Sequence, residues 1–331
     1  MKTYLPQTYK ALVAKDDSNP PRLQDLPLPT PGPNQILVKI AFAPINPSDI
    51  QTLQGEHRLS PQPPYPVGLE GSGVVAAVGE NLNRPFGIGD KVHVHLGGSI
   101  AQYALCSIED VSEMDENLTF EEAASHIINP ATVCYMVSLA KSEDAKTVIT
   151  TGASSTVGRM LIRALKEKGI RSINVVRQDK YIEELNSEGG DYVLNSEAED
   201  FYTKLEELVV KEKVRVLFDS INGEFTDKLM GILPENSTCY IYGSLGGNKY
   251  KRTETKELEN GKKVVGIRYL GYLKECKEKG GLDRFYKEIH TPLKTIFKTQ
   301  VQKIYPLDEV FDGIKFYEEN RSKGRVLIKP N

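Results

Sequence analysis

The chain has 331 residues, which is long for a single hydrophobic core, so its length favours two domains. A hydrophobic content of 39% and a charged content of 26% are ordinary for a soluble globular protein. The net charge of −3, with both signs interspersed, gives no electrostatic reason to expect nucleic acid or an anionic membrane as a partner. No apolar run approaches the roughly 20 residues that cross a bilayer.

The N-terminal residues MKTYLP lack the apolar core of a secretory signal and the arginines of an organellar presequence. We therefore expect a cytoplasmic protein, although a mature mitochondrial chain would have the same features. The four cysteines stand at no metal-ligand spacing to one another, which predicts buried, reduced thiols. They are Cys106, Cys134, Cys239 and Cys276.

Short apolar runs and turn residues dominate the first third of the chain. Residues 36–43 have a strand pattern, and three glycines within residues 68–73 precede another apolar run. Glycines at this density allow the tight bends of a compact barrel, so we predict a β-rich N-terminal domain. From the N-cap residue Thr119 the pattern becomes helical, and Pro130 is expected to interrupt it before a second helix at 132–140.

A β-α-β unit organises the second part of the chain. Residues 147–151 are a β-branched run, residues 152–158 a turn of small residues, and residues 159–168 a helix. A second apolar run, 173–176, ends on Arg177. In such a unit the helix N-terminus offers unpaired N–H groups and a partial positive charge to the pyrophosphate of a dinucleotide.

The glycine pattern of this turn leaves a second interpretation open. Compared with G-x-G-x-x-G, it has Gly152 and Gly158 but carries Ser154 and Ser155 where glycine is usual. The alternative is a helix that uses its glycines only as clearance for packing on a strand. The cation at Arg177 favours the nucleotide, because an acidic residue there suits a ribose 2′-hydroxyl and a basic one suits a 2′-phosphate. We therefore predict NADPH rather than NADH.

Strands and helices continue to alternate after this unit, which predicts a doubly wound parallel sheet. The expected strands include 214–219, 238–243 and 264–267. In the tail we expect one long helix at 281–297 and a last strand at 324–328. This strand is expected to return to the first domain and complete its sheet.

Several short motifs, in this order and at these spacings, carry a family resemblance. They are Ile45-Asn46-Pro47-Ser48-Asp49, Gly68-Leu69-Glu70-Gly71-Ser72-Gly73-Val74-Val75 with Val78-Gly79, Gly89-Asp90-Lys91-Val92, Asn129-Pro130-Ala131-Thr132 and Gly243-Ser244-Leu245. With them the chain resembles, over nearly its whole length, the medium-chain dehydrogenase/reductase superfamily. Within it, the chain is most similar to the zinc-free branch of quinone oxidoreductases and trans-2-enoyl-thioester reductases. Residues 169–177 are especially similar to the enoyl reductases.

The resemblance implies an α/β protein with a GroES-like, β-rich catalytic domain and a Rossmann domain whose doubly wound parallel sheet binds NADP. We place the catalytic domain at 1–125, completed by 285–331, and the Rossmann domain at 126–284. Zinc-free relatives commonly form homodimers through the edge of the Rossmann sheet. We therefore expect a homodimer through the strand after Val264.

The resemblance also implies where the cofactor binds. In the enoyl reductases the arginine that closes the second strand contacts the 2′-phosphate of NADPH, in agreement with the electrostatic argument for Arg177. Gly243 and Leu245 are expected beside the nicotinamide, at the strand end where ligands bind. The residues expected to bind the cofactor are Asn129, Thr132, Gly152, Ser154, Ser155, Thr156, Val157, Gly158, Arg177, Lys180, Tyr242, Gly243 and Leu245.

We expect no zinc. Zinc-dependent members need Cys and His ligands around an open coordination position. Asn46 stands where they carry the first Cys, and Leu69 where they carry the His. No Cys lies between Glu116 and Val133 to supply a further ligand.

Catalysis without a Lewis acid relies on positioning, on donors for a developing enolate and on a proton donor. The enoyl-thioester reductases carry a tyrosine after the Q-G that follows N-P-S-D, and His57 takes that place here. Its reference pKa of about 6.5 suits a proton donor, and the alternative is a solvated loop histidine. Tyr65 is a second candidate, with packing as its alternative. Asn46 is expected in the active site, with breaking or capping of a local element as its alternative.

The preferred hypothesis is an NADPH-dependent reductase that transfers hydride to a quinone or to an activated C=C such as an enone, without zinc. One alternative is a 2-enoyl-thioester reductase that acts on CoA or acyl-carrier-protein thioesters in mitochondrial-type fatty-acid synthesis. The departure at His57 counts against it. The other alternative is a non-catalytic NADPH-binding subunit or sensor, which the missing turn glycines motivate.

Overall fold

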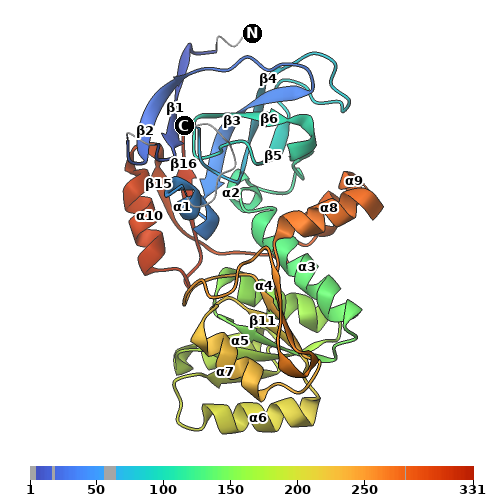
Figure 1. The fold of residues 1–331 in the computed structure, drawn as a ribbon. Helices are drawn as coiled ribbons and strands as arrows, with labels where there is room; N and C mark the ends of the chain where they lie inside the picture. The colour runs from blue at the N-terminus through green and yellow to red at the C-terminus, as the bar shows by residue number, and fades with distance from the viewer. Residues whose placement is uncertain (1–4, 17–18, 56–64, 280) are drawn as a thin grey trace. The chain divides into compact units, whose positions relative to one another are not determined.

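The computed structural model describes residues 5–16, 19–55, 65–279 and 281–331 (Figure 1). The chain divides into two compact units. Unit 1 comprises Met1–Ile128 and Tyr286–Asn331, and unit 2 comprises Asn129–Phe285. Both contain strands and helices, so the predicted α/β class is confirmed. Within the described residues, no helix is both long and apolar enough to cross a membrane.

The strands of unit 1 pair mostly antiparallel. They are β1 (Thr8–Val13), β2 (Arg22–Pro27), β3 (Gln35–Pro44), β4 (Glu70–Val78), β5 (Lys91–His95), β6 (Tyr103–Ser107), β7 (Val111–Glu113), β15 (Val301–Pro306) and β16 (Arg325–Lys329). The main sheet has the order β15-β16-β3-β4-β5-β7, and β6 also pairs with β3. β1 and β2 form a separate antiparallel pair.

The end of the chain closes the main sheet of unit 1. β16 lies antiparallel to β3, with Leu327 opposite Pro44 and Ile328 opposite Ala43. β15 extends the sheet parallel to β16. The helices of this unit are α1 (Pro47–Leu53), α2 (Phe120–Ala123) and α10 (Val310–Glu319), and α10 packs on β15 and β16.

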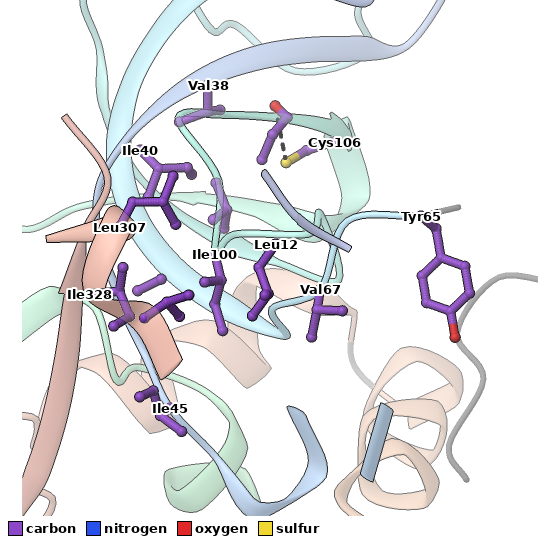
Figure 2. Packing of buried hydrophobic residues seen from close by; sticks show 14 of the residues in the cluster. Leu12, Val38, Ile40, Ile45, Tyr65, Val67, Ile100, Cys106, Leu307 and Ile328 are labelled. Atoms are coloured by element: carbon purple, nitrogen blue, oxygen red, sulfur yellow. Dashed lines mark hydrogen bonds between the residues drawn. The ribbon is translucent and has the colours of Figure 1, made fainter. Parts of the chain in front are cut away.

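Apolar side chains from both ends of the chain fill the core of unit 1. Leu12 of β1, Ile40 of β3 and Ile328 of β16 are fully buried in one cluster. Figure 2 shows them together with Ile100 and Leu307. Burying one side chain of this size contributes about 1.5–3 kcal/mol, so packing as well as strand pairing holds the tail in place.

Unit 2 contains a parallel sheet with one antiparallel edge strand. Its strands are β8 (Thr147–Thr151), β9 (Arg171–Val176), β10 (Tyr192–Asn195), β11 (Val216–Asp219), β12 (Thr238–Ile241), β13 (Thr255–Glu257) and β14 (Lys263–Gly266). Their order is β10-β9-β8-β11-β12-β14-β13, and only β13 runs antiparallel to its neighbour among these described strands. The chain leaves β8 toward β9 on one side and later fills β11 on the other. The carboxyl ends of the paired strands β8 and β11 therefore mark the switch point at which such sheets bind ligands.

Helices connect the strands of the unit 2 sheet. In chain order the remaining helices are α3 (Ile128–Ser142), α4 (Thr156–Glu167), α5 (Ile182–Glu188), α6 (Phe201–Glu212), α7 (Glu224–Ile232), α8 (Tyr269–Lys279) and α9 (Leu282–His290). α4 joins β8 to β9 and completes the predicted β-α-β unit. It buries an apolar face that includes Leu161 and Leu165, and it ends before Gly169, whose φ of +68° favours glycine.

Two sequence predictions are wrong in extent. The expected helix at 281–297 is α9, which ends at His290, because Pro292 disfavours helical backbone at the residue before it. Pro130 does not interrupt a helix but lies in the first turn of α3, where its missing N–H removes no hydrogen bond. The edge strand β13 was not predicted, so β14, the strand expected near Val264, is not the edge of the sheet.

Candidate functional site

The turn after β8 needs glycine at two positions. Gly152 has a φ of +60°, and a Cβ there would overlap Oγ of Ser220, the residue that follows β11. A Cβ at Gly158 would overlap the backbone of Ala153. The first glycine thus brings the ends of β8 and β11 together, and the second lets α4 start close to the turn. Both serve the close backbone approach that a bound phosphate also requires.

The N-terminus of α4 has backbone N–H groups that make no hydrogen bond within the described residues. Ser155 is the N-cap, and its Oγ accepts a hydrogen bond from the N–H of Gly158 at 3.1 Å. In the part of the chain that is described, the N–H groups of Thr156 and Val157 donate to no protein acceptor. Both residues, like Ser154, are half-buried. Free N–H groups at the positive end of a 12-residue helix fit an anionic phosphate.

A buried carboxylate fixes the neighbouring strand ends. Asp219 is fully buried at the end of β11, and Oγ1 of Thr151 on β8 donates to it at 2.5 Å. It also accepts hydrogen bonds from Oγ1 of Thr226 at 2.6 Å and from the N–H groups of Ile221 and Asn222, each at 3.0 Å. These hydrogen bonds therefore hold the ends of β8 and β11 in fixed positions at the switch point. The sequence analysis missed this residue, although its position at the carboxyl end of a buried strand was a usable signal.

Arg177 directly follows β9, the strand beside β8. Its side chain is exposed, and the guanidinium contacts no acceptor within the described residues. Arg159 on α4 differs, because it binds Glu184 and Glu188. Lys180, also exposed, lies over the ring of Tyr181 at 5.0 Å. Arg177 thus presents an uncompensated cation at the carboxyl edge of the sheet.

The end of β12 supplies the other side of this edge. Tyr242 donates its hydroxyl to the carbonyl of Thr151 at 3.0 Å, and burial raises the pKa of its phenol to about 12. Gly243 packs against the backbone of Ser220, where a Cβ would lie 2.7 Å from the carbonyl oxygen. Leu245 is 51% exposed, and its Cδ1 would be 3.9 Å from a Cβ at Gly152. The predicted residues that follow β8 and β12 therefore lie close to one another at the carboxyl end of β11.

Two further cations lie near the end of β12, and the sequence analysis did not identify them. Arg252 donates Nη1 to the carbonyl of Tyr242 at 3.2 Å. Burial, and then the charge of Arg268, lower the pKa of Arg252. Two positive charges in this region favour an anion near them.

Asn129 and Thr132 lie in the first turns of α3. Asn129 is 8% exposed and Thr132 is half-buried. Both belong to unit 2, whereas Asn46, Tyr65 and the expected donor His57 belong to the chain of unit 1. His57 lies outside the described residues.

Asn46 and Glu70 are part of a buried ionic network in unit 1. Asn46 donates Nδ2 to Oε1 of Glu70 at 3.1 Å, and its Oδ1 accepts from Arg325 at 2.9 Å. Arg325 also binds Oε1 of Glu70 at 3.2 Å, and Oε2 accepts from the N–H groups of Ile127 and Ile128. The amide of Asn46 is thus largely engaged in holding Glu70. Arg325 had no local sequence signal, because its partners lie far away in the chain.

Asp49 and Tyr65 complete the description of this unit. Asp49 is 1% exposed and accepts hydrogen bonds from the N–H groups of Asn46 and Leu69. Burial raises the pKa of Asp49 to about 7. Tyr65 is 8% exposed and belongs to the core cluster, at the edge of the group shown in Figure 2. Its surroundings are those of a packing residue.

The chain is similar to known oxidoreductases in both sequence and structure. Residues 32–120 match the alcohol dehydrogenase GroES-like domain. A mitochondrial enoyl-[acyl-carrier-protein] reductase of Caenorhabditis elegans is 30% identical over 250 residues, which cover 71% of this chain and 70% of the relative. A quinone oxidoreductase of Sus scrofa is 26% identical and covers 76% of each chain. A solved structure from Mesorhizobium loti, described as an NADPH:quinone reductase, has a TM-score of 0.86 at 25% identity and covers 99% of this chain and 100% of its own.

The glycine turn, the free helix N-terminus and the parallel sheet define a dinucleotide-binding oxidoreductase of the nicotinamide-dependent kind. The chain belongs to the medium-chain dehydrogenase/reductase superfamily. The predicted GroES-like class of unit 1 is thereby confirmed. These two relatives are named as a reductase and an oxidoreductase, which counts against the alternative of a non-catalytic subunit.

Proposed function

We propose that this protein is an NADPH-dependent reductase that delivers hydride to a quinone or to an activated C=C, such as an enone, without a catalytic zinc. One observation carries the choice of cofactor. Arg177 offers an exposed cation, uncompensated by the described residues, beside the turn that fits a pyrophosphate. A 2′-phosphate provides the partner that this cation lacks.

Different residues of unit 2 bind different parts of the cofactor. The free N–H groups of Thr156 and Val157, with Ser154 and Ser155 beside them, bind the pyrophosphate. Arg177 and Lys180 hold the 2′-phosphate. A bound nicotinamide supplies the hydride, and the protein supplies its orientation.

The remaining expected cofactor contacts lie at two other places in unit 2. Tyr242, Gly243 and Leu245 lie along the nicotinamide half, where the exposed apolar side chain of Leu245 excludes water. Asn129 and Thr132, at the start of α3, contribute polar contacts.

The proposed catalytic residues belong to the chain of unit 1. His57 donates the proton, and Tyr65 is a second candidate donor. Asn46 orients neighbouring groups through its contacts with Glu70 and Arg325. Asn46 and Leu69 replace the Cys and His ligands of the zinc-dependent members, which supports chemistry without a catalytic zinc.

Nucleotide titration of the full chain tests the cofactor. NADPH should bind more tightly than NADH, and Arg177→Ala should weaken NADPH binding by about 10- to 100-fold, because a charge-assisted hydrogen bond contributes about 1.5–3 kcal/mol. NADH binding should change little. Protein fluorescence measures both affinities.

Arg171→Ala is the matched control for this titration. Arg171 lies at the other end of β9 and pairs with Glu212, so its removal should leave NADPH affinity unchanged. Equal affinity of the wild-type protein for the two nucleotides would refute the role of Arg177. Failure to bind either nucleotide would refute the proposed function as a whole.

A 2-enoyl-thioester reductase is the second candidate. The enoyl reductase of C. elegans supports it, and so does the pair of cations at Arg252 and Arg268, which suits the phosphates of a CoA or carrier-protein arm. Turnover of NADPH with a quinone, an enone and an enoyl-CoA compares the candidates directly. A kcat/KM at least tenfold higher for the thioester would favour the second candidate.

We also propose a cytoplasmic homodimer, with a mitochondrial location as the alternative. In unit 2 the exposed strand β13, rather than β14, is the edge on that side of the described sheet, and we propose it for pairing with a second copy. Light scattering of the purified protein measures the mass in solution. A monomer at all concentrations would contradict the dimer.

A further inference from the structure

Three histidines from distant parts of the sequence meet inside unit 1. His93 lies on β5, His126 lies between α2 and α3, and His290 is the last residue of α9. His93 is 0% exposed and His126 is 1% exposed, and His290 is half-buried. Nothing in the nucleotide chemistry of unit 2 requires this cluster.

The ring nitrogens of these histidines are close enough to share one ion. One ligand atom of each residue lies within 4.8 Å of the other two. The ring centroid of His93 lies 4.6 Å from the ring centroid of His126 and 4.2 Å from that of His290. In a tetrahedral site with Zn–N bonds of about 2.0–2.1 Å, the nitrogens are about 3.3 Å apart. Side-chain rotations that move each nitrogen by about 1 Å would therefore bring the three ligands into this arrangement.

Each histidine also has a buried nitrogen without a protein partner. Within the described residues, Nε2 of His93, Nδ1 of His126 and Nε2 of His290 make no hydrogen bond. Buried polar atoms in native proteins nearly always have a partner. Three buried nitrogens without a protein partner in one cluster indicate that they share a partner that is not part of the protein.

The hydrogen bonding of His93 fixes which of its nitrogens can bind a metal. Its Nδ1 lies 2.9 Å from the carbonyl oxygen of Ala123. A carbonyl only accepts, so Nδ1 donates and Nε2 is left with a lone pair. A backbone carbonyl that orients a histidine in this way is the usual support of a metal ligand.

The electrostatics of the cluster suit neutral imidazoles beside a cation. Burial lowers the pKa of His93 to about 4 and holds the pKa values of His126 and His290 well below their usual range. Neutral imidazole is the form that binds metal ions. Oε2 of Glu70 lies 4.0 Å from Nδ1 of His126 and adds negative charge nearby.

We propose that His93, His126 and His290 form a binding site for a divalent transition metal, of which Zn²⁺ best fits three imidazoles in a tetrahedral arrangement. A water molecule completes the coordination. The ligands differ from Asn46 and Leu69, which stand at the zinc-ligand positions of the zinc-dependent members. A bound ion ties the end of α9 to β5 and to the segment before α3, which fastens the returning tail to the N-terminal part of unit 1.

Metal titration of the full chain tests this site without nucleotide or substrate. After treatment with a chelator, the protein should bind one equivalent of Zn²⁺ in competition with a chromophoric chelator. His93→Gln, His126→Gln and His290→Gln should each weaken binding at least tenfold. Failure of the wild-type protein to bind Zn²⁺, or full affinity in these variants, would overturn the proposal.

His95→Gln is the matched control. His95 lies on the same strand as His93 and is equally buried, but it is not a member of the cluster. This variant should keep wild-type affinity, and an equal loss of binding would overturn the assignment of ligands. Circular dichroism shows whether each variant folds.

X-ray absorption of the zinc-loaded wild-type protein needs no variant. Three imidazole nitrogens at about 2.0–2.1 Å support the site. A shell without imidazole, or one built from cysteine sulfur, would overturn it. A neutral stack of histidines that binds no metal is the competing explanation, and it predicts no specific uptake of Zn²⁺.

Discussion

Glu70 in unit 1 and Asp219 in unit 2 are both fully buried carboxylates, and each accepts hydrogen bonds from four donors. The donors of Asp219 are neutral, and three of them lie within seven residues of it in the chain. Those of Glu70 include the guanidinium of Arg325, 255 positions away, and the N–H groups of Ile127, just before α3, and of Ile128, its first residue.

This difference separates two ways of tolerating a buried charge. In unit 2, nearby turn residues stabilise the carboxylate of Asp219. This fixes the strand ends next to the turn after β8, and the N–H groups of that turn stay free for a ligand. Unit 1 uses its carboxylate to join segments from the two ends of the chain. A buried ion pair is costly to break from one side, so the unit 1 network should be the more sensitive of the two.

The largest expected effect comes from removing the cation of unit 1. Arg325→Met leaves Glu70 charged and without its ionic partner, and the free energy of unfolding should fall by about 3–5 kcal/mol. Chemical denaturation measures the change. Combining this variant with Glu70→Gln should recover part of the loss, because no unpaired charge then remains buried.

Arg321→Met is the control for this prediction. Arg321 pairs with Glu318 at 3.6 Å on the surface, where both side chains are more than 40% exposed. Its removal should change the unfolding free energy by less than about 1 kcal/mol. Equal losses in the two variants would contradict the importance of burial.

A smaller effect is expected from the carboxylate of unit 2. Thr151→Val removes one hydrogen bond to Asp219 and also the Oγ1 that accepts from the N–H of Ser220 at 2.9 Å. The cost should be about 1.5–3 kcal/mol, because Asp219 keeps three donors. Thr151→Ser keeps the hydroxyl and should lose less than half as much. Denaturation of both variants provides the measurement. A cost above that of Arg325→Met would reverse the comparison.

The pH dependence of unit 1 has the smallest effect when it is counted for a change of one pH unit. Because the pKa of Asp49 is raised to about 7, the folded state holds this proton more tightly than the unfolded chain. Stability should therefore fall by about 1 kcal/mol per pH unit as the pH rises from about 4 to about 7, and then level off. Asp49→Asn should remove this contribution. An unchanged slope between pH 5 and 7 would show that another group is responsible.

Local patterns in the sequence predicted the parts of the fold that local physics determines. The β-branched run of β8, the small residues of the turn and the apolar face of α4 identify the β-α-β unit. Arg177 was predicted as a cofactor contact because a cation at the end of a strand has a direct electrostatic meaning, and its role stays a proposal. The failures at Pro130 and Pro292 come from judging a proline without knowing whether a helix begins or ends there.

Contacts between distant residues could not be predicted in this way. Arg325 lies in an ordinary strand sequence, and only the pairing of β16 with β3 brings it to Glu70. The same is true of His93, His126 and His290, which share no motif. Their meeting depends on the packing of α9, whose extent the sequence analysis predicted wrongly.

The division of the chain has a consequence during protein synthesis. The residues of unit 2 are contiguous, whereas unit 1 needs β16, which follows all of unit 2 in the chain. Translation adds about 5–20 residues per second, so unit 2 emerges whole while β3 still lacks a neighbouring strand. Until β16 has been made, the first domain in the chain therefore cannot finish folding, and the end of β3 that pairs with β16 stays exposed.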